Sequence, residues 1–237
     1  ALPIFTRVIC AWVPTEVTGL LPGRGAASSA YFSQFVIEQA RKTQNQLSGL
    51  TLDLVKCFNC ISWSFGFHAM AAMGIPTELL NMWIGSLQVL TRHWMLSNQV
   101  IHVGKGTCCF PEGDQYSVLV MISLATAWIS QARSVLPTMP KSFLSAYADN
   151  WSWMLSMVDL HLPVLKKTVA VTQAAGVRID WGKTWFWSTC KRHAGLIQSF
   201  VQECAPGQTI HQKSSAADLG FQLQYSRSEE RRVGKEC

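Results

Sequence analysis

One acidic residue at the junction of two apolar runs constrains this chain more than any other feature. Asp149 stands at that junction, inside SFLSAYADNWSWML, which covers residues 142–155. A buried carboxylate is costly unless a partner compensates it, whereas Asp and Asn are common in turns. The stretch therefore predicts a hairpin with strands over about 143–147 and 151–155. Its Asp is either an ordinary turn residue or a carboxylate held out to a metal ion, and the letters YADN leave both interpretations open.

A second acidic residue supports the metal interpretation. Asp53 lies inside the apolar stretch LTLDLVKCF, which is typical of a strand over about 50–55. Two aspartates on neighbouring strands would form a site of hard oxygen ligands, which suits Mg²⁺. Phosphoryl transfer by two metal ions, held about 3.5–4 Å apart, uses such a site. We therefore expect Asp53 and Asp149 to lie on adjacent strands, within reach of a shared metal site.

The rest of the pattern mixes helices and strands without strict alternation. Apolar spacing and breaker residues predict helices after the Pro-Gly-Arg-Gly turn at 22–25, over about 59–74, 76–94 and 159–176, and from near Ser117 onward. Alternation and turn residues predict a hairpin over 93–106 with its turn at Ser97-Asn98, and a strand, turn and strand over 177–189. This mixture, with its hairpins, favours an α+β fold with an antiparallel sheet.

Composition excludes several classes of protein. Hydrophobic residues make up 49% of the 237 and charged residues only 14%, which favours a full core over disorder. The longest apolar run, residues 118–130, is shorter than the roughly 20 residues of a membrane span. The spacing of the eight cysteines indicates no disulfide ladder, and the lone CxxC of Cys57 and Cys60 favours a structural role over redox or zinc chemistry. We also expect no signal peptide. We expect an intracellular protein of the cytoplasm or nucleus, neither secreted nor bound to a membrane, and the net charge of +6 is compatible with a polyanionic partner.

The two ends of the chain differ from the rest. Residues 227–237, RSEERRVGKEC, are dense in charge and have no apolar face. They resemble the translation of a sequencing adapter, so we expect them to lie outside the fold. The chain also starts without Met, which suggests a piece shortened at its N-terminus. Residues 1–226 are therefore expected to form a single domain.

Four stretches resemble the motifs A, B, C and D of reverse transcriptases, in the order of that family. They are LTLDLVKCFN, FPEGDQYS, YADN and GVRIDWGKT. Upstream, GLLPGRGAASSAYF resembles the fingers segment of non-LTR retrotransposon enzymes, and downstream AADLGFQL resembles the segment after motif D. The chain is identified on these motifs as the reverse transcriptase domain of a non-LTR (LINE-like) retrotransposon. The resemblance implies a polymerase palm with an antiparallel sheet, helical fingers elements and a thumb that is largely missing.

The resemblance also implies an activity and a metal site. Members of this family are RNA-directed DNA polymerases, which add dNTPs to a DNA primer on an RNA template. By analogy, Asp53 and Asp149 would hold two Mg²⁺ ions, or Mn²⁺ in their place. The carbonyl of Leu54 and the side chain of Asn150 would complete the ligands. No specific protein partner is implied.

Other residues acquire roles only through the same resemblance. Phe58 falls where the family has its sugar gate, which excludes a 2′-OH, although a core Phe is the competing interpretation. Lys183 would protonate the leaving pyrophosphate, whereas a lone Lys is usually a solvated surface charge. Glu112 and Gly113 would line the nucleotide pocket. Arg24 would contact the template or the incoming nucleotide, with a turn residue as the alternative.

Departures from the family pattern keep two other functions open. Asn150 replaces the second acid of motif C, and Asn59 stands where most relatives have Asp. In motif B, Cys109 and the pair Gln115-Tyr116 replace a Gly and a Pro-Leu. These changes would suit a degenerate copy, that is, a palm that binds nucleic acid without catalysis. An RNA-dependent RNA polymerase is the third candidate, but Phe58 argues against it because RNA synthesis needs room for the 2′-OH.

Overall fold

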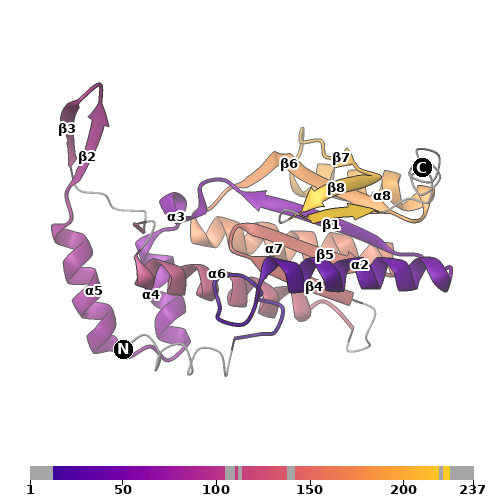
Figure 1. Ribbon diagram of the computed structural model, residues 1–237, viewed down its shortest axis with the longest axis horizontal. Coiled ribbons are helices and arrows are strands. Elements are labelled where there is room, and N and C mark those ends of the chain that lie inside the picture. Colours follow the sequence, from indigo (N-terminus) through magenta and orange to yellow (C-terminus); the bar gives the residue numbers. More distant parts are fainter. Residues whose placement is uncertain (1–12, 105–109, 112–113, 138–141, 219–220, 225–237) are drawn as a thin grey trace, which may run out of the picture.

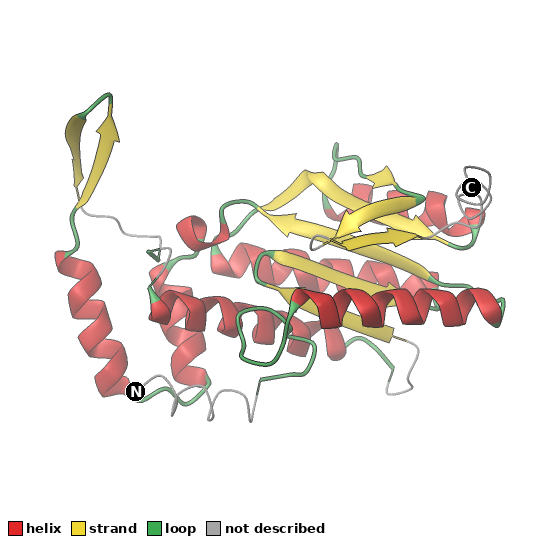
Figure 2. Ribbon diagram, viewed as in Figure 1, coloured by secondary structure: helices red, strands yellow, loops and turns green. Residues whose placement is uncertain are grey.

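The computed structural model describes residues 13–104, 110–111, 114–137, 142–218 and 221–224. Within them, a five-stranded sheet and its covering helices form the predicted α+β fold (Figures 1 and 2). The strand order is β4-β5-β1-β6-β7, and all neighbours are antiparallel except β6 and β7. The strands are β1 (Ser48–Leu54), β4 (Ser142–Tyr147), β5 (Asn150–Leu155), β6 (Ile179–Ser188) and β7 (His211–Gln212).

Different helices cover the two faces of the sheet. They are α6 (Gln115–Arg133) and α7 (His161–Ala175) on one face and α2 (Ala26–Lys42) on the other (Figure 1). Strand β6 sends its side chains alternately to the two faces, because successive side chains of a strand point in opposite directions. Phe186 joins the large core cluster under α6 and α7, whereas Trp185 and Trp187 pack in a smaller cluster with α2. A strand residue can therefore be assigned to one face of the sheet by the cluster that it joins.

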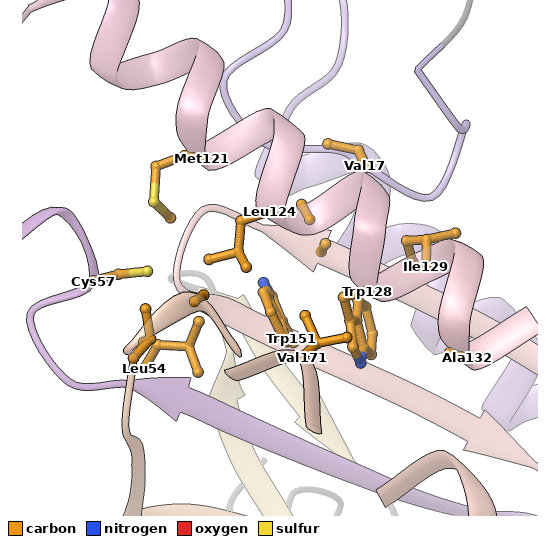
Figure 3. Packing of buried hydrophobic residues seen from close by; sticks show 14 of the residues in the cluster. Val17, Leu54, Cys57, Met121, Leu124, Trp128, Ile129, Ala132, Trp151 and Val171 are labelled. Carbon is orange, nitrogen blue, oxygen red and sulfur yellow. The ribbon is translucent and has the colours of Figure 1, made fainter. Parts of the chain in front are cut away.

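The large core is built around stacked tryptophans. Trp128 of α6 lies flat against Trp151 of β5, with ring centroids 4.8 Å apart and an interplanar angle of 17° (Figure 3). The indole N–H of Trp128 donates to the hydroxyl of Thr168 on α7 at 2.9 Å, so this buried donor is satisfied. The stack and this hydrogen bond thus join α6 to β5 and to α7.

A buried histidine ties the start of α7 to the sheet. His161 Nδ1 accepts the indole N–H of Trp153 at 2.9 Å, and its Nε2 lies 2.9 Å from the hydroxyl of Ser48. Because Nδ1 is an acceptor here, the ring is neutral with its proton on Nε2. Burial is the main cause that lowers the pKa of His161 to about 3, which agrees with a neutral ring.

The remaining elements surround this layered core. They are α3 (Cys57–Cys60), α4 (Trp63–Ala72), α5 (Thr77–Val89), the hairpin β2 (Arg92–Leu96) and β3 (Gln99–Gly104), the 3₁₀ turn η1 (Val158–Leu160), α8 (Lys191–Cys204), and the hairpin β8 (Ser215–Asp218) and β9 (Phe221–Gln224). The β2–β3 hairpin extends away from the sheet in Figure 1, and its turn lies at Ser97-Asn98, as predicted. No helix in the described ranges combines the length and hydropathy needed to cross a bilayer.

Three predicted elements differ from those observed. The helix expected over 76–94 ends at Val89 as α5, and residues 92–94 belong to strand β2. The helix expected over 59–74 is divided into α3 and α4, because Ser62 caps a new helix by accepting the Phe65 N–H at 3.2 Å. The strand, turn and strand expected over 177–189 form one strand, β6, with a shift of register in its middle. Helix α8 was not predicted, and the tail 227–237 lies outside the described residues.

Candidate active site

A row of polar residues crosses three neighbouring strands of the sheet. Asp53 of β1 pairs with Asn150 of β5 on one side and with Asp180 of β6 on the other. Residues opposite each other on neighbouring strands point to the same face. Leu52 and Leu54 enter the large core, so Asp53 points to the opposite face, where its side chain is 25% exposed. The row therefore presents oxygen atoms on an accessible part of the sheet.

The turn between β4 and β5 brings Asp149 to this row. The last pair of that hairpin is Tyr147 with Asn150, which leaves Ala148 and Asp149 as a two-residue loop. Ala148 adopts a φ of 50°, in the left-handed region that such tight turns require. The Leu54 N–H donates to the Asp149 carbonyl at 3.0 Å, so the loop is fixed beside the residue that follows Asp53.

The surroundings of Asp149 disfavour its charge. Burial is the largest cause that raises the pKa of this carboxyl, and the negative charge of Asp53 raises it further. A backbone hydrogen bond and the positive charge of Lys183 oppose the rise. The Asp149 carboxyl therefore lies within electrostatic reach of both Asp53 and Lys183.

Lys183 supplies a positive charge at the same place. Its Nζ lies 3.0 Å from Asp53 Oδ2 and 3.8 Å from Asp180 Oδ2. The hydrogen bond to Asp53 is the main cause that raises the pKa of Lys183, so the amine stays protonated. The structure thus brings together five of the predicted site residues, namely Asp53, Leu54, Asp149, Asn150 and Lys183.

Phe58 lies close to this group along the chain but is shared with the core. It belongs to α3, which starts after Lys56 adopts a left-handed φ of 42°. The ring is half-buried and packs against the large core cluster, and the Phe58 carbonyl accepts the Phe110 N–H at 2.8 Å. Its partial exposure is compatible both with a gate and with a core residue, so its role stays a prediction.

Three other predicted residues lie apart from the carboxylate group or outside the described ranges. Glu112 and Gly113 fall in a range that the structure does not describe. Just beyond them, Asp114 caps α6 by accepting the Tyr116 N–H at 3.2 Å. Arg24 donates to the carbonyls of its own loop, at 2.7 Å to Pro14, 3.0 Å to Val17 and 3.3 Å to Val13. These contacts fit the alternative of a turn residue, and a role in binding a nucleotide stays a prediction.

Sequence reasoning missed a glycine that packs against the acidic turn, the Ala148-Asp149 loop between β4 and β5. Residues 16–19 run beside the edge strand β4, where the Thr18 N–H donates to the Ala146 carbonyl at 2.9 Å. A Cβ atom on Gly19 would lie 2.6 Å from the Ala148 nitrogen and 2.9 Å from Tyr147 Cα. Both contacts are with backbone, which cannot give way without moving the turn. The resemblance to a fingers segment begins at this glycine, but only packing shows its function.

Replacing Gly19 with alanine is therefore expected to displace the loop that carries Asp149. Overpacking of this kind costs about 1–3 kcal/mol of unfolding free energy, which denaturant unfolding followed by circular dichroism would measure. Gly195 on the exposed side of α8 is a matched control, because a Cβ there meets nothing within 4 Å. The Gly195→Ala variant should be unchanged or slightly stabilised. Equal stability of Gly19→Ala and wild type would show that the contact is not tight.

The comparison with protein families agrees with this geometry. The family profile described as "Reverse transcriptase (RNA-dependent DNA polymerase)" matches residues 5–223. No curated protein matches the sequence. Residues 53, 149 and 183, which the structure brings together, all lie within the matched range.

Solved structures of telomerase share the fold. Telomerase from Candida tropicalis in complex with a TWJ fragment of telomeric RNA superposes with a TM-score of 0.66 at 9% identity, over 97% of this chain and 37% of that one. The apo enzyme of the same organism gives 0.66 at 10% identity, over 94% and 38%. Telomerase from Candida albicans, also with a TWJ fragment, gives 0.58 at 9% identity, over 93% and 36%. The chain thus spans less than two fifths of these proteins, and at such low identity the likeness shows the fold alone. With the family match over residues 5–223, the chain belongs to the reverse transcriptase (RNA-dependent DNA polymerase) family.

Proposed function

We propose that this chain is the fingers and palm of a non-LTR (LINE-like) retrotransposon enzyme that extends a DNA primer on an RNA template. The observation that carries the proposal is the convergence of Asp53, Asp149 and Lys183 on one exposed part of the sheet. The order of the four motifs and the fingers-like segment support the retrotransposon branch. Substrates would be dNTPs, and the partners would be the RNA template and the DNA primer.

The donors present fit a hard divalent cation. Two carboxylates, the Leu54 carbonyl and the Asn150 amide oxygen are the ligand types that Mg²⁺ and Mn²⁺ prefer. In the part of the chain that the structure describes, no group of three or more His, Cys, Asp or Glu side chains is arranged to hold a metal. Asp53 and Asp149 would therefore share the ions with backbone, Asn150, water and the substrate phosphates, as is common for Mg²⁺.

Each proposed site residue would have its own role in nucleotide addition. Bound ions would supply Lewis-acid activation of the primer 3′-hydroxyl and neutralise charge on the phosphates. Asp53 and Asp149 would hold and orient those ions from a rigid sheet. Lys183 would hold a proton at Nζ, next to the carboxylates, and donate it to the leaving pyrophosphate. Phe58 would exclude the 2′-OH of a ribonucleotide, and Glu112, Gly113 and Arg24 would line the nucleotide and template pocket.

A second function is favoured by one specific feature. Asn150 pairs with Asp53 in the position of the second acid of motif C, and an amide adds an oxygen but no charge. One ion would bind less tightly there than between three carboxylates. A palm that binds an RNA–DNA duplex without extending it is therefore the competing proposal.

Primer extension with metal removal distinguishes the two functions. The chain is incubated with dNTPs and a DNA primer annealed to an RNA template, with Mg²⁺ or with EDTA. A polymerase extends the primer with Mg²⁺, stops completely with EDTA, and recovers when excess Mg²⁺ or Mn²⁺ is added. The Asp159→Asn variant, changed at an exposed acid beyond the far end of β5, is the matched control and should extend normally. Duplex binding in a gel-shift assay without extension under any metal would instead identify the inactive palm.

A further inference from the structure

A third acidic residue lies beside Asp53, one of the predicted metal ligands, and has no role so far. Asp180 of β6 pairs with Asp53 and is 30% exposed on the same face of the sheet. The register between β1 and β6 shifts here, since Asp53 pairs with Asp180 and Thr51 with Trp185. Residues 181–184 are therefore opposed by Leu52 alone and bulge out of the ladder.

Asp180 organises this bulge. Its Oδ1 accepts the backbone N–H of Lys183 at 3.2 Å, and its carbonyl accepts the hydroxyl of the buried Thr184 at 2.8 Å. The bulge turns Lys183 back over the sheet, so that its Nζ lies between two carboxylates. Asp53 Oδ2 is the nearer at 3.0 Å, and Asp180 Oδ2 lies at 3.8 Å.

This arrangement sets up a competition for one oxygen atom. A divalent cation at Asp53 needs the carboxylate that the Lys183 ammonium contacts, and the two positive charges repel each other. The Lys183 side chain is 70% exposed, so a displaced ammonium could move into solvent. The Asp180 carboxylate lies on the next strand and offers a second anionic partner within a short movement of Nζ.

We propose that Asp180 is a positioning residue that receives the Lys183 ammonium when a divalent cation takes Asp53. The transfer frees the metal ligand and keeps the proton donor beside the reacting phosphates. It also explains why the bulge joins Asp180 and Lys183 through two separate contacts. The inference rests on the proposed function, because it assumes a metal at Asp53.

A double-mutant cycle on metal affinity tests the transfer without measuring activity. Binding of Mn²⁺ alone is followed by the electron paramagnetic resonance of the free ion, in wild type, Asp180→Asn, Lys183→Met and the double variant. Asn keeps an oxygen acceptor for the Lys183 N–H but loses the charge, so the bulge should persist. Lys183→Met removes the competing cation and should tighten Mn²⁺ binding about tenfold. Asp180→Asn should weaken it about tenfold in wild type but only two- to threefold in the Lys183→Met background.

The outcomes separate this inference from the proposed function. Equal effects of Asp180→Asn in both backgrounds would mean that Asp180 acts only as a general negative charge, and the transfer would be refuted. If Mn²⁺ does not bind, or binds in a way that does not depend on Asp53 and Asp149, the metal site itself is refuted. The Asp159→Asn variant controls for the loss of one remote charge and should bind like wild type. A crystal structure of the wild-type chain with Mn²⁺ gives a check that needs no variant, because Nζ should then lie closer to Asp180 than to Asp53.

Discussion

Replacing Asp149 with asparagine is expected to lower primer extension by about 10³-fold or more, because a metal ion contributes several kcal/mol to phosphoryl transfer. The substitution keeps the size and shape of the side chain while removing one of the two carboxylates proposed to hold the metal. The hairpin should remain intact, since the Leu54 N–H bonds to the Asp149 carbonyl of the backbone. Single-turnover extension of a labelled primer would measure the loss.

The same variant is expected to be at least as stable as the wild type. Burial, and then the charge of Asp53, raise the pKa of Asp149, so the folded chain binds this proton more tightly than the unfolded chain does. By linkage, folding is favoured while the carboxyl is protonated, and that advantage is lost as the pH rises through the raised pKa. The carboxylate form of Asp149 is therefore less favourable in the folded chain than in the unfolded one, and asparagine removes that form. Thermal unfolding at pH 7 should show an unchanged or higher midpoint.

Together these two measurements distinguish a functional acid from a turn residue. An ordinary turn Asp would lose stability on substitution and leave primer extension proportional to the folded fraction. Asp159→Asn, at an exposed position in η1, should change neither quantity. Full extension by a folded Asp149→Asn variant would reject the metal role of this residue.

The hairpin and its acidic turn could be predicted because their signals are local. Alternating apolar residues on both sides of YADN fix two strands, and the two residues between them fix the turn. The observed strands, Ser142–Tyr147 and Asn150–Leu155, differ from the predicted ones by a single residue at the start of each. The Ser97-Asn98 turn was predictable for the same reason, since both residues tolerate a positive φ.

Two contacts between distant segments could not be predicted from such local signals. Whether Asp180 lies opposite Asp53 depends on a register between β1 and β6 that shifts at the bulge, and nothing in the local pattern gives its size. Gly19 contacts a backbone almost 130 residues later in the chain, and glycine is common in loops for its backbone freedom alone. Helix α8 did carry a signal, because His193, Ile197 and Val201 recur every fourth residue and are all buried.

Substituting valine or alanine for Phe58 is expected to raise incorporation of rNTPs relative to dNTPs on the order of 10- to 1000-fold. A smaller side chain would no longer overlap with the 2′-OH, and steric overlap at one group is worth a few kcal/mol. The ratio of steady-state kcat/KM values for the two nucleotides measures this discrimination. It needs only that the variant extends a primer at all.

The core interpretation of Phe58 predicts a different result for the same variants. Truncating a fully buried Phe costs about 3–5 kcal/mol, and a half-buried ring should cost somewhat less. If Phe58 is only a core residue, Phe58→Val loses stability while the nucleotide ratio of the folded molecules stays constant. Phe65 of α4 is the matched control, because it is also partly buried against the large core cluster. Phe65→Val should lower the unfolding midpoint without changing the nucleotide ratio. A Phe58→Val variant that behaves like Phe65→Val would refute the sugar gate, and an RNA-dependent RNA polymerase would then again compete as the activity of this palm.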